Sequence, residues 1–237
     1  MQAERRVAIM QPYFFPYLGY FQLMAKVDAF VVLDDVNYIN RGWINRNRIN
    51  VGGAASTFTM PLEQATQNRL ICDIDISGAV DWRSRMIKTF RQAYAKASQR
   101  ERALPLVERI VQYPAANLSD FLLHALCCLR DHLGLATQII PTSRRYGNAE
   151  LKAQARIIDI CQREKADVYI NAIGGQDLYD HASFAEAGIK LQFLNPALPA
   201  YATAATAPFV PGLSIIDALM HCDEAELASQ LQAGTLS

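Results

Sequence analysis

Two short apolar runs close to the start of the chain constrain its fold more than any other feature. Residues 7–10 and 29–33 are almost entirely apolar, and each has the length of a buried strand. Residues 17–26, between them, carry a helical apolar pattern. Two buried strands joined by a helix predict a parallel pair with a right-handed crossover.

The same alternation of strands and helices returns later in the chain. Further strands are expected at residues 57–60, 70–76, 137–140, 167–170 and 189–193. Helices are expected at residues 81–102, at 117–133, and then at 149–165, 182–187 and 213–220, with a loop over residues 37–49. We therefore expect one α/β domain over residues 1–237, a doubly wound and mainly parallel sheet of nucleotidyltransferase or Rossmann-like type, with a helical insert at about 81–134.

Composition excludes several classes of protein. The 237 residues balance 23 Lys and Arg against 23 Asp and Glu, and 51% of them are hydrophobic. An apolar, weakly charged chain is not disordered, and a zero net charge argues against a protein that coats nucleic acid. No apolar run approaches the ~20 residues of a membrane span, and residues 1–6 lead into no signal peptide.

The five cysteines form no CxxC pair and show no metal-ligand spacing with histidine, so no metal site is expected. We therefore expect the cysteines to be reduced thiols in a cytoplasmic protein. Standard phosphate and hydrolase motifs are also missing, which argues against a Rossmann dehydrogenase, a P-loop kinase, a zincin and an ordinary α/β-hydrolase.

Polar sequence follows four of the expected strands. In an open parallel sheet, ligands bind at the carboxyl ends of the strands, so these segments are expected to converge on one site. They begin at Gln11, at Asp34, at residue 142 and at residue 171. Gly174 and Gly175 in the last of them allow a backbone to approach a ligand closely, although two glycines also simply make a turn.

The densest polar cluster is residues 41–48. Its arginines and asparagines suit a phosphate or carboxylate, and its tryptophan suits a sugar or base, but a solvated basic loop with an inward tryptophan is an equal reading. The candidates in this cluster are Trp43, Asn45, Arg46, Asn47 and Arg48.

Two residues are candidates for acid–base chemistry. Asp34 ends an apolar strand and could orient or deprotonate an amine or hydroxyl, or could instead cap a turn or meet an arginine. His181 follows the glycine pair and is the histidine that we would test as a base. Ser143 and Arg144 are candidates for phosphate binding.

Several segments together resemble the WbqC-like family. They are residues 10–21, 28–36, 43–49, 156–161, 174–180 with Phe184, 188–189 and 209–217. The family is associated with bacterial surface-polysaccharide clusters, and its members are described as transferases of glycine or other acyl groups to amino sugars. Many relatives carry His where this chain has Met10. The layout of the first strand, the segment from Tyr17 to Tyr20 that opens a helix, and the second strand also resembles that of HIGH-type nucleotidyltransferases. Tyr17 to Tyr20 would stand at the place of the HIGH motif, and both histidines of that motif are replaced.

The resemblance implies a transferase that moves an aminoacyl group such as glycyl, or an acyl group, onto a nucleotide-linked amino sugar. ATP or an acyl donor would be the cofactor, and a homodimer is left open. Residues expected to line the pocket are Gln11, Pro12, Tyr13, Tyr17, Gly19 and the Trp43 cluster, with Gly174 and Gly175. The alternatives are a nucleotidyltransferase that activates a carboxylate and a non-catalytic ligand-binding protein, the latter because of Met10.

Overall fold

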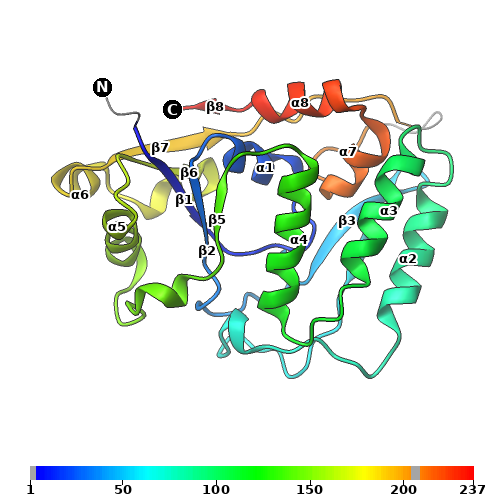
Figure 1. Cartoon of the computed structure of the whole chain (residues 1–237), viewed down its shortest axis with the longest axis horizontal. Helices are drawn as coiled ribbons and strands as arrows, with labels where there is room; N and C mark the ends of the chain where they lie inside the picture. Colours follow the sequence, from blue (N-terminus) through cyan, green and yellow to red (C-terminus); the bar gives the residue numbers. More distant parts are fainter. Residues whose placement is uncertain (1–3, 204–208) are drawn as a thin grey trace.

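The computed structural model describes residues 4–203 and 209–237. At its centre is a six-stranded sheet with the order β5-β2-β1-β6-β7-β8 (Figure 1). Its strands are β1 (Arg6–Met10), β2 (Ala29–Val32), β5 (Gln138–Ile140), β6 (Val168–Ala172), β7 (Lys190–Asn195) and β8 (Thr235–Leu236). The first five pair in parallel, and β8 is antiparallel to β7. The predicted α/β fold with a mostly parallel sheet is confirmed.

The strand order reverses at β1. The chain moves from β1 through β2 to β5 on one side, and then returns to pair β6 with the other edge of β1. This is the 3-2-1-4-5 order of a doubly wound sheet, with β8 added at one edge. In such a sheet the ligand crevice lies outside the carboxyl ends of the strands at the reversal, which here are β1 and β6.

Helices cover both faces of the sheet, because side chains alternate along each strand. Val7 and Ile9 of β1 belong to one core, and Ala8 belongs to the other. In Figure 1, α5 (Ala153–Arg163) and α6 (His181–Glu186) lie to the left of the sheet. The other face is covered by α1 (Leu18–Ala25), α4 (Leu118–His132) and α8 (Glu224–Gln232).

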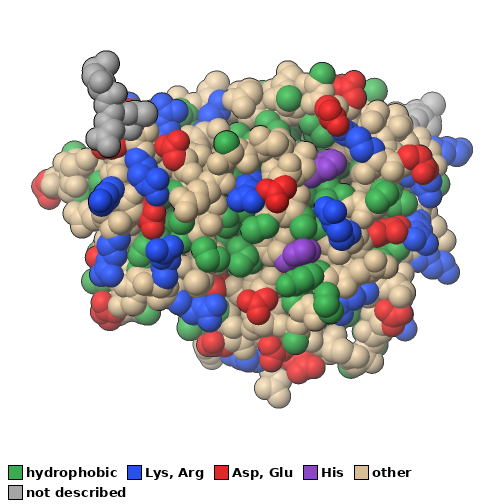
Figure 2. Space-filling model, in the orientation of Figure 1, with side chains coloured by type: hydrophobic (Ala, Val, Ile, Leu, Met, Phe, Trp, Pro, Cys, Tyr) green, Lys and Arg blue, Asp and Glu red, His purple; other side chains and the backbone are tan. Residues whose placement is uncertain are grey.

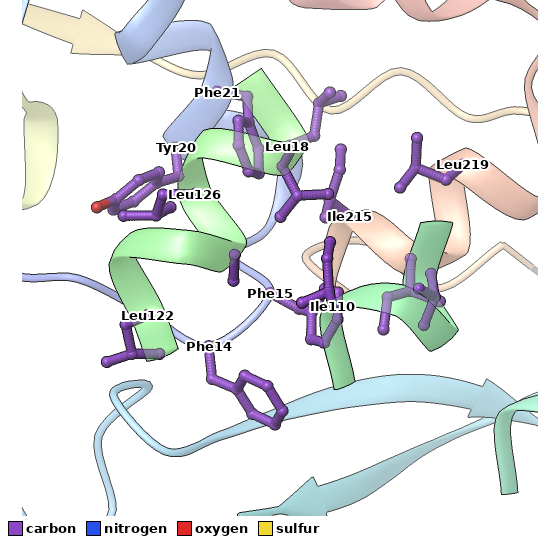
Figure 3. Packing of buried hydrophobic residues seen from close by; sticks show 14 of the residues in the cluster. Phe14, Phe15, Leu18, Tyr20, Phe21, Ile110, Leu122, Leu126, Ile215 and Leu219 are labelled. Atoms are coloured by element: carbon purple, nitrogen blue, oxygen red, sulfur yellow. The ribbon is translucent and has the colours of Figure 1, made fainter. Parts of the chain in front are cut away.

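A further layer lies beyond α1 and α4. It contains α2 (Trp82–Ala93), α3 (Arg100–Val111), α7 (Ile215–His221) and the hairpin of β3 (Arg46–Val51) with β4 (Ala54–Thr59). Phe14 and Phe15 extend from the loop after β1 into this layer, where their side chains are fully buried (Figure 3). The Phe58 ring packs edge-on against Phe90, 5.0 Å between centroids, so the hairpin is anchored to α2.

Three expectations about local structure are wrong. Residues 37–49 are not all loop, because β3 begins at Arg46. Residues 70–76 form no continuous strand, because residues 71–73 are a short 3-10 helix, η1 (Ile71–Asp73), and the residues around it make only isolated bridges. The Asn117 side-chain amide donates to the carbonyls of Cys72 and Ile74, and the Ile74 carbonyl also accepts from the Leu118 amide, so this segment is held by the start of α4 rather than by a strand. The single helix expected at 81–102 is broken between α2 and α3, and α3, α8 and β8 were not foreseen.

Positive and negative side chains are interspersed on the face shown in Figure 2. Within the described residues, no helix has the length and hydropathy to span a membrane.

Candidate active site at the strand reversal

A cavity of about 460 Å³ lies at the predicted crevice between the ends of β1 and β6. Met10 and Leu33 contribute from the ends of β1 and β2, and Asn171 and Ala172 contribute from the end of β6. Six residues that the sequence singled out as binding residues line it: Gln11, Tyr13, Tyr17, Gly19, Gly174 and Gly175. We call this the switch-point cavity.

A second cavity, of about 300 Å³, adjoins the first. Its walls are Tyr13, Tyr17, Trp43, Asn47, Arg48 and Gly212. Since Tyr13 and Tyr17 line both cavities, the loop after β1 forms the boundary between them. We call the second one the Arg48 cavity.

Gly19 allows Tyr17 to take its place in this boundary. Tyr17 is the residue before the first turn of α1, and its ring lies over Gly19. A Cβ atom at Gly19 would lie 2.4 Å from Cε2 of Tyr17, much closer than two carbon atoms can approach. Burial raises the pKa of the phenols of Tyr13 and Tyr17, so both stay protonated at neutral pH and can donate hydrogen bonds.

Asn47 fixes the loop that carries the tyrosines. Its Nδ2 donates to the carbonyls of Phe14 and Phe15, at 3.1 and 2.8 Å, and the Phe14 amide donates to the Trp43 carbonyl at 2.9 Å. Phe15 has a φ of 45°, which non-glycine residues rarely adopt. The contacts of Asn47 therefore hold the loop in a conformation that the chain alone would not favour.

The arginines and asparagines of residues 41–48 separate into two groups. Arg46 donates from Nε and Nη2 to the carbonyls of Gly42 and Arg41, and Asn45 is held between the Tyr38 hydroxyl and the Met60 carbonyl. Neither lines the switch-point cavity or the Arg48 cavity. Trp43, Asn47 and Arg48 do line one, so the structure brings together only part of the predicted cluster.

The Asp34 carboxylate is fully buried below this edge of the sheet. It accepts hydrogen bonds from the Ser119 and Thr142 hydroxyls, at 2.8 and 2.7 Å, and from the Ser143 amide at 3.2 Å. The Arg144 guanidinium lies 3.5 Å away. Asp34, Ser143 and Arg144 therefore form one group, but none of them lines either cavity.

Two other predicted residues also lie outside the cavities. His181 is exposed at the first residue of α6, with its ring 5.8 Å from that of Phe193. Pro12 is buried in the loop after β1. The catalytic roles of Asp34 and His181 remain predictions.

Tyrosines and amides supply most of the polar side chains of the combined lining. Asn171, which is buried, accepts a 2.8 Å hydrogen bond from the Ala172 amide and closes the cavity beside Gly175. In residues 4–203 and 209–237, the lining includes one charged side chain, Arg48, and no carboxylate, histidine or cysteine. Nor do the described residues contain a cluster of three metal-binding side chains. Sequence reasoning did not single out Tyr20, Tyr179 or Gly212 as site residues, because nothing local to them signals chemistry.

The sequence profile of the WbqC-like protein family matches residues 11–229, which include nearly all of these lining residues. The chain belongs to the WbqC-like protein family. The relative "Uncharacterized protein Rv1507c" from Mycobacterium tuberculosis (strain ATCC 25618 / H37Rv) is 29% identical to this chain over 222 residues, which cover 92% of this chain and 94% of that protein. No solved structure matches the chain significantly. The resemblance seen in the sequence is thus confirmed at the level of the family.

Proposed function

We propose that this WbqC-like protein is a transferase that moves an aminoacyl or acyl group onto an amino sugar, which is carried as a nucleotide-linked sugar. The observation that carries the proposal is the pair of adjoining cavities at the strand reversal, both lined by Tyr13 and Tyr17. An aromatic, hydrogen-bonding cavity beside a cationic one matches a ligand with a sugar ring and a phosphate.

In this proposal the sugar ring occupies the switch-point cavity. The side-chain amide of Gln11 has no hydrogen-bond partner among the described residues, so its donors and acceptor are free for sugar hydroxyls. The tyrosine rings offer flat apolar surface for the faces of the ring. Asn171 adds a second amide at the opposite wall.

The transfer itself requires a neutral amine at the acyl carbon. The amine nitrogen forms the new C–N bond, the bond from the acyl carbon to its leaving group breaks, and the leaving group departs with the electron pair of that bond and takes up the proton that the nitrogen releases. The hydrogen bonds of Asp34 support a role in fixing residues 142–144 rather than as the base, because its carboxylate is already occupied by three donors. The phenols at the cavity can donate to the developing oxyanion.

A thermal-shift panel of UDP- and dTDP-linked amino sugars, ATP, acyl-CoA and glycine tests the proposal, because a ligand that binds only the folded state raises the melting temperature. Transfer to the ligands that bind is then followed by mass spectrometry. We expect Gln11→Ala to weaken binding of the amino sugar, and Gln138→Ala, at an exposed position on β5, to leave it unchanged. An amino sugar that neither shifts the melting temperature nor becomes acylated contradicts the proposal.

The strand order favours a second candidate. The 3-2-1-4-5 order and the start of α1 at the cavity are typical of folds that bind nucleotides. A nucleotidyltransferase that activates a carboxylate would release pyrophosphate from ATP in the presence of the acid, and the proposed transferase acting on a ready-made acyl donor would not. Binding of a ligand without either reaction would indicate a non-catalytic binding protein.

A further inference from the structure

Arg48 carries a positive charge that no carboxylate neutralises in the part of the chain that the structure describes. Arg144 and Arg156 differ in this respect, since Arg144 approaches Asp34 and Arg156 pairs with Asp35. Arg48 is half-buried, its Nη2 has one distant partner, the Gly212 carbonyl at 3.4 Å, and its Nε is buried with no partner.

Such an arginine is costly unless something else supplies the missing interactions. A guanidinium has five N–H donors, and a donor that is removed from water without a partner destabilises the protein. Trp43 compensates only in part, with the guanidinium carbon 5.3 Å from its ring centroid. Trp43 is itself 38% exposed, so a ligand can reach this side of the cavity.

Arg46 shows what a structural arginine in the same strand looks like. It is two residues away and also contacts Trp43, but its Nε and Nη2 are satisfied by the carbonyls of Gly42 and Arg41. The two arginines are equivalent in the sequence and different in the fold. Two donors of Arg46 are taken up by the backbone and its side chain lines neither cavity, whereas Arg48 lines the Arg48 cavity with its Nε unpartnered.

We propose that Arg48 is the receptor for the phosphoryl group of a sugar phosphate whose ring lies in the switch-point cavity. This inference rests on the proposed function and names the part of the ligand that each cavity takes. Among the described residues, the switch-point cavity has no charged side chain, so an anion there would lose its hydration without a counter-ion. The phosphoryl group therefore lies past Tyr13 and Tyr17, where the guanidinium can donate two parallel hydrogen bonds to its oxygens.

Isothermal titration calorimetry with glucosamine, glucosamine 1-phosphate and UDP-glucosamine tests this assignment. The proteins are the wild type, Arg48→Gln, Arg48→Lys and the control Arg85→Gln, which changes an exposed arginine of α2. We expect Arg48→Gln to weaken both phosphorylated ligands by about ten-fold or more and to leave glucosamine unchanged. Arg48→Lys keeps the positive charge but cannot donate two parallel hydrogen bonds, so it should weaken binding of the phosphorylated ligands less than Arg48→Gln does. Arg85→Gln binds all three ligands as the wild type does.

A salt series on the wild type provides a measurement that does not depend on the folding of a variant. Affinity for glucosamine 1-phosphate should fall with ionic strength, and affinity for glucosamine should not. The inference is overturned if Arg48→Gln binds the phosphorylated ligands normally, or weakens glucosamine equally, or if the salt series shows no difference. If the amino sugars bind and Arg48→Gln binds the phosphorylated ligands as tightly as the wild type does, the proposed function stands and this inference fails. If none of the three ligands binds, both fail.

Discussion

The guanidinium of Arg156 and the carboxylate of Asp35 form an ion pair in the interior, with Nη2 2.6 Å from Oδ2 and each side chain less than a tenth exposed. The two residues are 121 positions apart, since Asp35 lies three residues after the end of β2 and Arg156 lies in α5. The Asp35 carboxylate also accepts from the Ser143 hydroxyl, and Arg156 Nε donates to Asn148. The pair thus fixes the segment after β5 to the end of β2.

Removing one partner of this pair should be strongly destabilising. We expect Arg156→Met to lower the free energy of unfolding by about 3–5 kcal/mol, because Asp35 is left as a buried charge with no cation. Replacing both partners, as in Arg156→Met with Asp35→Leu, should recover much of the loss. Urea unfolding followed by circular dichroism measures both. Arg91→Met, which breaks the exposed pair with Glu108, is the control and should cost about 1 kcal/mol or less. Equal losses for the two single variants would contradict this account.

The contact of Gly19 with the Tyr17 ring predicts that Gly19→Ala destabilises the wild type but stabilises a Tyr17→Ala variant. In the wild type, Gly19→Ala should destabilise by about 1–3 kcal/mol, because the new methyl group displaces the ring. In a Tyr17→Ala background the same substitution should stabilise by up to about 1 kcal/mol, because alanine favours a helix. Urea unfolding of the four proteins gives the coupling. The same effect of Gly19→Ala in both backgrounds would contradict it.

Asn47 and Asn50 lie on the same strand, and both accept a backbone hydrogen bond through Oδ1, but only Asn47 also donates from Nδ2. Asn47 donates to two carbonyls, and Asn50 accepts from the Gly53 amide. We expect Asn47→Asp to lose about 1–3 kcal/mol at neutral pH, because a carboxylate faces the carbonyls, and to regain stability at lower pH once it can donate a proton. Asn50→Asp keeps its acceptor and should be tolerated. Urea unfolding at two pH values compares them, and similar losses for both would refute the assignment.

Met10 stands in the switch-point cavity, where the described lining has no histidine or carboxylate. If the proposed transfer occurs there, Met10→His supplies a base, and we expect a faster transfer by about ten-fold or more. The gain should appear as the pH rises through about 6.5, where an imidazole becomes neutral. Met10→Gln is the control, since an amide cannot take up a proton at these pH values. A gain that is shared by Met10→Gln, or that does not depend on pH, would argue against acid–base catalysis at this position.

Burial lowers the pKa of His124, which stacks on Tyr113 with 3.7 Å between ring centroids. The unfolded chain therefore takes up this proton at a higher pH than the folded protein does. The free energy of unfolding should fall as the pH drops through about 6.5 and below. His124→Phe keeps the stacked ring and removes the titration, so its stability should depend less on pH between about 7 and 5.5. Urea unfolding over this range measures the slope. A slope equal to that of the wild type would contradict the prediction.

The sheet could be predicted because its central strands are buried on both faces. Residues 29–32 are all fully buried, so every position in β2 is apolar and the strand is visible without any other information. β3 shows no such run. Its inward positions include Asn47, which is buried because it binds the carbonyls of Phe14 and Phe15, residues more than 30 positions away. That relationship cannot be read from the strand alone.

The position of the candidate site could be predicted from the strands, but the roles of its individual arginines could not. Tyr13 and Gly175 could be placed near each other because both follow parallel strands, and the fold brings these ends together. The separate fates of Arg46 and Arg48 could not be predicted. Carbonyls of the preceding turn accept hydrogen bonds from the Arg46 guanidinium, whereas Nε of Arg48 is buried with no partner. Only the conformation of that turn decides between them.

The central position of β1 also affects how the protein is made. The ribosome releases β1 early, but its partner β6 follows about 160 residues later, as the contact between Arg5 and Asp167 shows. At ordinary rates of translation, this delay is about ten to thirty seconds. During this delay, the edge of β1 that faces away from β2 has no strand to pair with and is open to aggregation. Chaperones that bind nascent chains should therefore engage this protein through its first strand.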